Sequence, residues 1–235
     1  MLADLAGRLE VGDYDEWRSY VLKLKEVHGL TYKVEDGGKI QGQRVVEEIH
    51  RATGGDAIIS TDVGQHQMWV AQYFRFKRPR QLISSGGLGA MGFGLPSALG
   101  AQIAFPDTTV VDVAGDGSFQ MMSQELATAT QYNLPVKVVI LNNQYLGMVR
   151  QWQDMFLDKR YVATDLSSSP DFVKLAESYG AVGIRVIEPT DVRPALDEAL
   201  AVRKPVLLDF RIESESNVYP MVPAGAGLHE MILPD

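Results

Sequence analysis

From about residue 40 to residue 212, short runs of apolar, β-branched residues alternate with longer segments in which apolar residues recur every three or four positions. The short runs have the length and composition of buried strands, and the longer segments have the spacing of amphipathic helices. This alternation is typical of a parallel sheet with helices on both faces. The sequence therefore predicts an α/β fold with a mostly parallel, six-stranded sheet, whose strands are expected within residues 56–61, 80–85, 108–114, 135–142, 181–189 and 204–212.

The helices are expected in the segments that join or flank these strands. A proline and an aspartate, Pro170 and Asp171, are typical of the start of a helix, and this helix is expected to run to Tyr179. A single helix is expected to connect the third and fourth strands. The predicted helical segments are 41–53, 64–74, 92–105, 119–133, 170–179 and 190–202.

The same patterns divide the chain into three parts. Residues 1–38 contain an amphipathic segment and most of a polar break, "EDGGK", so they are interpreted as a linker or interdomain segment. Residues 39–213 hold the alternating pattern and form the predicted domain. Residues 214–235 are rich in proline and glycine and are expected to form a C-terminal tail that runs over the surface or onto a partner.

Composition narrows the classes of function. The net charge is -8, and acidic and basic residues are interspersed, so no basic stripe indicates a nucleic-acid partner. The chain has no cysteine, which excludes disulfides, thiolate metal ligands and cysteine nucleophiles. Residues 81–106 carry no charge and are long enough to span a membrane, but six glycines and Pro96 favour a strand, a glycine-rich turn and a buried helix. No secretory signal and no membrane partner are predicted.

Polar residues follow two of the predicted strands. Asp116 lies between Gly115 and Gly117 after the third strand, and Asn143 follows the fourth. Since parallel strands end at the same edge of a sheet, the two side chains are expected to meet. A helix beginning near Ser118 would direct its first N–H groups and the positive end of its dipole to this edge, where they suit a phosphate.

One carboxylate and one amide oxygen give a partial shell for Mg²⁺, which commonly completes its shell with phosphate oxygens. This predicts a diphosphate-bearing ligand. The alternative is that "GDG" is an ordinary turn and "NN" an ordinary strand end. The absence of a Walker A loop makes a nucleoside triphosphate a poor candidate.

The spacing of "GDG" and "NN" is similar to the thiamin diphosphate motif, in which the aspartate and the second asparagine bind Mg²⁺. The segments "TDVGQHQMW", "GGLGAMGFGLPSALGAQ", "NLPVKVVILNNQYLGMVRQWQ" and "VYPMVP" extend the likeness. Together they resemble the catalytic subunit of acetohydroxyacid synthase, also called acetolactate synthase. The resemblance covers essentially everything from residue 40 onward.

The resemblance implies a role for each matching residue. Gln65 and His66 would be polar contacts of the diphosphate. The carbonyl of Gly89 would accept a hydrogen bond from the aminopyrimidine ring of the cofactor, and Met91 would hold the cofactor in a bent conformation. From the residues alone, the favoured interpretation of His66 is a solvated surface histidine and that of Met91 is a core residue. Trp152, the implied wall of the acceptor pocket, could equally be a helix-packing residue. The implied metal ligands are Asp116, Asn143 and the main-chain oxygen of Tyr145, and the implied cofactor-binding set is Val63, Gly64, Gln65, His66, Gly89, Met91, Gly115, Asp116, Gly117, Ser118, Asn143, Tyr145, Leu146, Gly147 and Met148.

The implied activity is that of a transferase of branched-chain amino-acid biosynthesis: pyruvate is decarboxylated, and the resulting enamine joins a second 2-keto acid, pyruvate or 2-ketobutyrate. Thiamin diphosphate, Mg²⁺ and, in the complete enzyme, FAD are the implied cofactors. A homodimer or a complex with further domains, and a separate regulatory subunit, are the implied partners. The implied location is the bacterial cytoplasm, or a plastid in a eukaryote.

In this family the glutamate that activates the cofactor belongs to another domain, so no catalytic residue is expected in this chain. Glu47, Glu48 and Glu125 are poor substitutes, because they lie on helices away from the expected reacting end. The chain alone is therefore predicted to bind the cofactor weakly and not to turn over pyruvate. The alternatives are another thiamin diphosphate carboligase or decarboxylase, and a non-catalytic regulatory module with the same fold.

Overall fold

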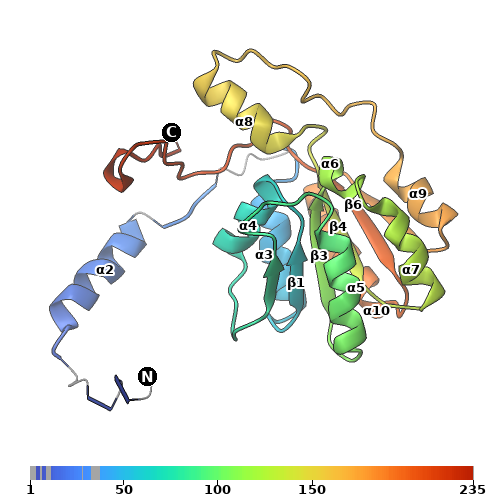
Figure 1. Cartoon of the computed structure of the whole chain (residues 1–235), viewed down its shortest axis with the longest axis horizontal. Helices are drawn as coiled ribbons and strands as arrows, with labels where there is room; N and C mark the ends of the chain where they lie inside the picture. The colour runs from blue at the N-terminus through green and yellow to red at the C-terminus, as the bar shows by residue number, and fades with distance from the viewer. Residues whose placement is uncertain (1–3, 6, 9–11, 28, 33–37, 235) are drawn as a thin grey trace. The chain divides into compact units, whose positions relative to one another are not determined.

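The chain separates into two compact units, which Figure 1 shows as ribbons. The first, Met1–Lys33, contains helix α2 (Asp15–Val27), whose Trp17 and Tyr20 are exposed. The second, Val34–Asp235, contains the sheet. Most of the predicted polar break falls outside the described residues; the computed structural model describes residues 4–5, 7–8, 12–27, 29–32 and 38–234.

The sheet of the second unit has six strands in the order β2-β1-β3-β4-β6-β5, and every neighbouring pair is parallel. The predicted fold class is therefore confirmed. β2 lies on one side of β1 and β3 on the other, so the connections change direction at β1. The strands are β1 (Ile58–Thr61), β2 (Leu82–Ser84), β3 (Val110–Gly115), β4 (Lys137–Asn142), β5 (Val182–Val186) and β6 (Val206–Arg211).

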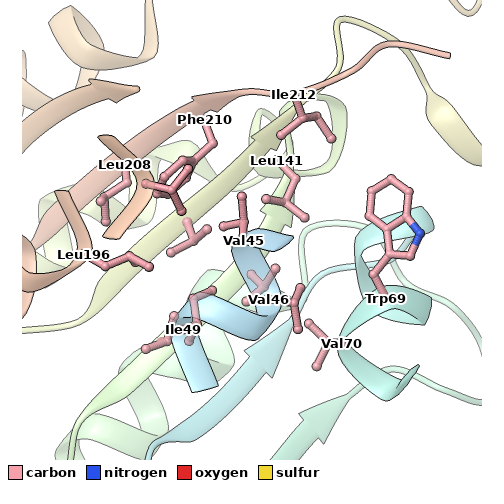
Figure 2. Close-up of a cluster of buried hydrophobic side chains, with 14 of the residues drawn as sticks. Val45, Val46, Ile49, Trp69, Val70, Leu141, Leu196, Leu208, Phe210 and Ile212 are labelled. Carbon is pink, nitrogen blue, oxygen red and sulfur yellow. The ribbon is translucent and has the colours of Figure 1, made fainter. Parts of the chain in front are cut away.

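Helices cover both faces of this sheet because successive residues of each strand point to opposite faces. On one face, residues such as Leu141 and Leu208 pack against α3, α4 and α10 (Figure 2). On the other, Val138 and Leu207 pack against α5, α7 and α9. The helices of this unit are α3 (Gly42–Ala52), α4 (Gln65–Tyr73), α5 (Gly94–Ala104), α6 (Asp116–Phe119), α7 (Leu126–Gln131), α8 (Gly147–Phe156), α9 (Phe172–Ser178) and α10 (Val192–Ala201), with 3₁₀ turns η1 (Ser123–Glu125), η2 (Pro189–Asp191) and η3 (Leu228–Glu230).

The prediction of one continuous helix over residues 119–133 is wrong. The segment is divided into the single turn α6, the 3₁₀ turn η1 and the short helix α7. Met122 leaves helical geometry, with φ of -136° and ψ of 25°, and packs against the turn at Gly92, where a Cβ would lie 2.7 Å from its Cγ. This contact favours the break, and the long dipole expected from a continuous helix is absent from the Asp116 edge.

The uncharged stretch 81–106 contains β2, a glycine-rich turn and α5. None of the helices in the described part of the chain is both long enough and apolar enough to cross a membrane. The expectation of a surface tail from residue 214 is wrong at Val218, which is buried. Its backbone is hydrogen-bonded to Gln151 of α8.

Candidate functional site

A pocket lies at the carboxyl edge of the sheet, beside the switch point between β1 and β3 where such folds commonly bind ligands. Three segments form most of its wall: one follows β1, the second follows β3, and the third follows β4. The lining residues are Val63, Gly64, Gln65, His66, Trp69, Met91, Gly115, Asp116, Gly117, Ser118, Leu141, Asn143, Tyr145, Leu146, Gly147, Met148 and Val149. Every predicted cofactor-binding residue except Gly89 lies on this wall.

Asp116 is the first residue of α6, and its side chain is fully buried. Neither carboxylate oxygen forms a hydrogen bond with any residue that the structure describes. Burial raises the pKa of this carboxyl group to about 7, although nearby backbone N–H groups favour the charged form and Asp209 opposes it. A buried carboxylate without a partner is costly, so its environment calls for a cation or a proton.

Asn143 follows β4 and lines the same pocket. Its Nδ2 donates to Oε1 of Gln65 at 3.2 Å, and its Oδ1 accepts from the backbone N–H of Tyr145 at 3.0 Å. The intervening Gln144 has φ of 61°, a left-handed conformation that costs a non-glycine residue about 1 kcal/mol or more. The chain therefore turns sharply here, and the pocket wall includes both Asn143 and Tyr145.

His66 is buried in α4, so the interpretation as a solvated surface histidine is wrong. Burial lowers the pKa of His66 to about 3, which keeps the ring neutral at physiological pH. A Cβ on Gly64 would lie 2.9 Å from the ring, and one on Gly115 would lie 3.0 Å from it. The two glycines thus leave the space that the imidazole fills at the pocket wall.

Asp62 was missed in the sequence, although it ends the β1 segment. Its Oδ1 accepts two hydrogen bonds, one from the backbone N–H of Val63 at 2.9 Å and one from the backbone N–H of Gly92 at 2.8 Å. Asp62 thereby ties the segment after β1 to the turn that carries Met91. The missed residues of the wall itself, Trp69, Leu141 and Val149, are apolar, and nothing in their sequence context separates them from ordinary core residues.

Gly89 and Trp152 are not part of the pocket wall as described. Gly89 lies close to it, because a Cβ there would lie 3.7 Å from Cγ1 of Val63, and its φ of 66° favours glycine. Trp152 lies on α8, is 50% exposed and stacks edge-on against Phe156. Trp152 therefore does not line the described pocket, and its role in an acceptor pocket stays a prediction.

The three glutamates considered as substitute acids lie away from the pocket. Glu47 and Glu48 on α3 both pair with Arg51. Glu125 ends the turn η1, not a continuous helix, and accepts a hydrogen bond from Thr128 at 2.9 Å. None of the three is a lining residue of the described pocket.

The model of the family described as "Thiamine pyrophosphate enzyme, C-terminal TPP binding domain" matches residues 62–210, which contain the whole of this wall. The chain belongs to this family. Thiamine pyrophosphate is another name for thiamin diphosphate, so the pocket is in a thiamin diphosphate-binding domain.

Curated relatives confirm the resemblance to acetolactate synthase catalytic subunits. The chain is 54% identical to the acetolactate synthase isozyme 3 large subunit of Escherichia coli, over 99% of this chain and 41% of that protein. It is 46% identical to the large subunit of Haemophilus influenzae, over 94% of this chain and 39% of the relative. It is 44% identical to the chloroplastic acetolactate synthase 1 of Nicotiana tabacum, over 99% of this chain and 36% of the relative. The chain thus spans about two fifths of the length of these proteins.

A solved structure supports the same fold. The thiamine diphosphate-dependent 4-hydroxybenzoylformate decarboxylase of Rhodococcus jostii matches with a TM-score of 0.72 and 30% identity, over 80% of this chain and 35% of that chain.

Proposed function

We propose that this chain provides the metal- and diphosphate-binding half of the cofactor site of an acetolactate synthase. One observation carries the proposal: both oxygens of the buried Asp116 lack a hydrogen-bond partner among the described residues, and they line a pocket of the matching cofactor domain. Mg²⁺ prefers such hard oxygen ligands and takes phosphate oxygens to complete its shell. The residues present therefore fit the metal and the diphosphate.

The metal would be held by Asp116, by Oδ1 of Asn143 and by the main-chain oxygen of Tyr145. Each belongs to the pocket wall, and the turn at Gln144 brings the second and third of them together. The engagement of the Nδ2 of Asn143 by Gln65 fixes the position of its Oδ1, which accepts one hydrogen bond, from the N–H of Tyr145, and keeps its second lone pair for the metal. The metal would also remove the cost of the buried carboxylate, which couples its binding to the stability of the domain.

The diphosphate would lie against the glycines and Ser118 after β3 and against the segment from Val63 to His66. Glycines allow a close approach of backbone to phosphate, and a neutral His66 can donate a hydrogen bond without adding charge. Met91, with its flexible and apolar side chain, would support the cofactor's bent shape, and the carbonyl of Gly89 would accept from its aminopyrimidine. When bound, thiamin diphosphate supplies the nucleophilic carbon and the electron sink that decarboxylation of a 2-keto acid requires.

The substrates would be pyruvate and a second 2-keto acid, pyruvate or 2-ketobutyrate, with Trp152 beside the acceptor. Since no carboxylate other than Asp116 lines the described pocket, the acid that activates the cofactor would come from a different polypeptide segment. FAD, a homodimeric assembly and a regulatory subunit belong to this proposal as features of the complete enzyme. So does a location in the bacterial cytoplasm or in a plastid.

A second candidate function is that of another thiamin diphosphate decarboxylase, which the structural match to the Rhodococcus jostii enzyme supports. The higher identity to the Escherichia coli acetolactate synthase, 54% against 30%, favours the first candidate. A non-catalytic module is disfavoured, because the unpartnered, buried Asp116 lines the pocket together with Asn143.

Complementation tests the proposal. The purified chain would be assayed for acetolactate formation with thiamin diphosphate, Mg²⁺ and FAD, alone and with the remaining part of the Escherichia coli isozyme 3 large subunit. We expect no turnover by the chain alone and measurable turnover in the mixture. Robust turnover by the chain alone would contradict the proposed division of the site between segments.

A further inference from the structure

Three buried side-chain amides form a continuous chain of hydrogen bonds from the C-terminal segment to Asn143. Gln151 of α8 binds both backbone groups of Val218: its Oε1 accepts from the N–H at 2.8 Å and its Nε2 donates to the carbonyl at 3.0 Å. The Oε1 of Gln151 also accepts from Nε2 of Gln65 at 2.8 Å. The Oε1 of Gln65 accepts from Nδ2 of Asn143 at 3.2 Å.

The direction of every bond in this chain follows from its backbone end. A backbone N–H can only donate, so the group of Gln151 that faces Val218 N–H must be its oxygen. Gln65 must then present its NH₂ group to that oxygen, which leaves its own oxygen for Asn143. Asn143 in turn presents its NH₂ group to Gln65, so its oxygen points the other way. The backbone N–H of Tyr145 donates to that oxygen at 3.0 Å, which agrees with the orientation set from the far end.

Gln65 has little capacity left for a ligand. Its second N–H donates to the backbone carbonyl of Ser216 at 2.8 Å, so both of its donors and its oxygen are engaged within the protein. Its side chain is also buried. This arrangement suits a residue that holds its neighbours in place better than the direct polar contact with the diphosphate that the sequence predicted.

Gly147 makes room for this chain of amides. A Cβ at Gly147 would lie 2.2 Å from Oε1 of Gln65 and 2.5 Å from Nδ2 of Asn143. Any larger residue would therefore displace the hydrogen bond between the two amides. The absence of a side chain at the first position of α8 is thus explained by the contact between Gln65 and Asn143.

We infer that Gln151 and Gln65 are positioning residues that turn Oδ1 of Asn143 toward the metal, and that the C-terminal segment Ser216–Val218 sets this orientation. The inference rests on the proposed function of Asn143 as a metal ligand. An Asn143 amide turned the other way would present an NH₂ group to the cation, which cannot coordinate it. Partners that orient a metal ligand in this way typically change metal affinity by about 10- to 100-fold when they are removed.

The decisive variant is Gln151→Met, which keeps the length of the side chain and removes both of its hydrogen-bonding groups. Gln72→Met is the matched control. Gln72 donates to the carbonyl of Tyr219 at 2.9 Å, so it holds the same C-terminal segment from α4 but has no bond to Gln65 or Asn143 among the described contacts. Binding of Mn²⁺ would be measured by electron paramagnetic resonance at a fixed concentration of thiamin diphosphate.

We expect Gln151→Met to weaken Mn²⁺ binding by about 10-fold or more. Gln72→Met should stay within about 2-fold of the original chain. A second readout needs no ligand: hydrogen exchange of the Asn143 side-chain amide should accelerate in Gln151→Met and not in Gln72→Met. If Gln151→Met does not fold, Gly147→Ala breaks the chain at its other end and should accelerate the same exchange.

The inference is overturned if Gln151→Met leaves both metal affinity and amide exchange unchanged, or if Gln72→Met matches it in both. Its failure is distinguishable from failure of the proposed function. If the original chain binds neither Mn²⁺ nor thiamin diphosphate, the proposed function fails, and the exchange experiment on the unloaded chain still decides whether Gln151 orients Asn143.

Discussion

Asp116 and Asp209 are both fully buried carboxylates near the carboxyl edge of the sheet, on opposite sides of β4, yet their surroundings differ completely. Asp209 accepts from Asn142 at 2.8 Å and pairs with Arg185 and Arg211 at 3.2 Å each. Asp116 has no such partner among the described residues. Two equally buried aspartates therefore differ in their partners: the described protein supplies donors to the carboxylate of Asp209 and none to that of Asp116.

The difference separates structural from ligand-binding roles only together with the pocket: Asp112 also lacks a partner on either oxygen among the described residues, but it does not line the pocket, whereas Asp116 does. A buried charge with donors on both oxygens stabilises the fold around it, whereas a buried charge without donors destabilises the unloaded chain and favours whatever cation neutralises it. The two asparagines at the end of β4 divide in the same way. Asn142 donates a hydrogen bond to Asp209, while Asn143 belongs to the pocket wall.

The largest expected effect on stability is at Asp209. Asp209→Ala should lower the free energy of unfolding by about 3 kcal/mol, because it removes a charged acceptor from three donors, one of them the buried Asn142. Urea unfolding followed by circular dichroism measures it. Asp107→Ala, at an exposed aspartate, is the control and should change stability by less than about 0.5 kcal/mol. An equal effect of the two would remove the distinction drawn for Asp209.

The opposite sign is expected at Asp116. Asp116→Asn should raise the free energy of unfolding of the metal-free chain by about 2 kcal/mol at pH 8, because it removes an unpartnered buried charge. The pKa of Asp116 is raised to about 7, so the charge is present above pH 7 and the gain should fade as the pH drops toward 4. Unfolding at pH 8 and pH 5 tests this. If Asp116→Asn instead lost as much stability as Asp209→Ala, the inferred difference in role between Asp116 and Asp209 would be contradicted.

An effect that is small near neutral pH and grows as the pH falls is expected at His66. Its pKa is lowered to about 3 in the folded chain, against an ordinary value of 6.5, so below pH 6.5 the unfolded chain binds a proton that the folded chain does not. Stability is therefore lost as the pH falls from 6.5 toward 3. His66→Asn should remove this loss, so its stability relative to the original chain should improve by about 1 kcal/mol per pH unit below 6.5. If the stabilities of His66→Asn and of the original chain fell in parallel as the pH was lowered, His66 would not be held neutral by burial.

The sequence predicted those parts of the site that depend on strand topology. Because parallel strands end at one edge, Asp116 and Asn143 could be expected at one pocket from their positions after the third and fourth runs, and both line it. The four inner strands follow the same logic, since β1, β3, β4 and β6 are short apolar runs that are almost entirely buried, whereas the edge strands β2 and β5 are only partly buried.

What the sequence could not provide depends on contacts between distant segments. The break after α6 follows from the packing of Met122 on Gly92, and the burial of Val218 follows from its pairing with Gln151. Neither has a local signal, because a glutamine in an amphipathic helix is ordinarily read as a surface residue. The place of Trp152 on an exposed side of α8 likewise depends on the rotation of that helix relative to the pocket.

The central claim is that Asp116 is an open metal ligand that anchors a diphosphate. The most direct test is calorimetric titration of the chain with thiamin diphosphate, with and without Mg²⁺, for the original sequence and for Asp116→Asn at pH 7.5. We predict that Mg²⁺ strengthens binding to the original chain by about 10-fold or more and leaves binding to Asp116→Asn unchanged. Equal Mg²⁺ dependence in the two chains, or none in either, would contradict the assignment of Asp116 as the metal anchor.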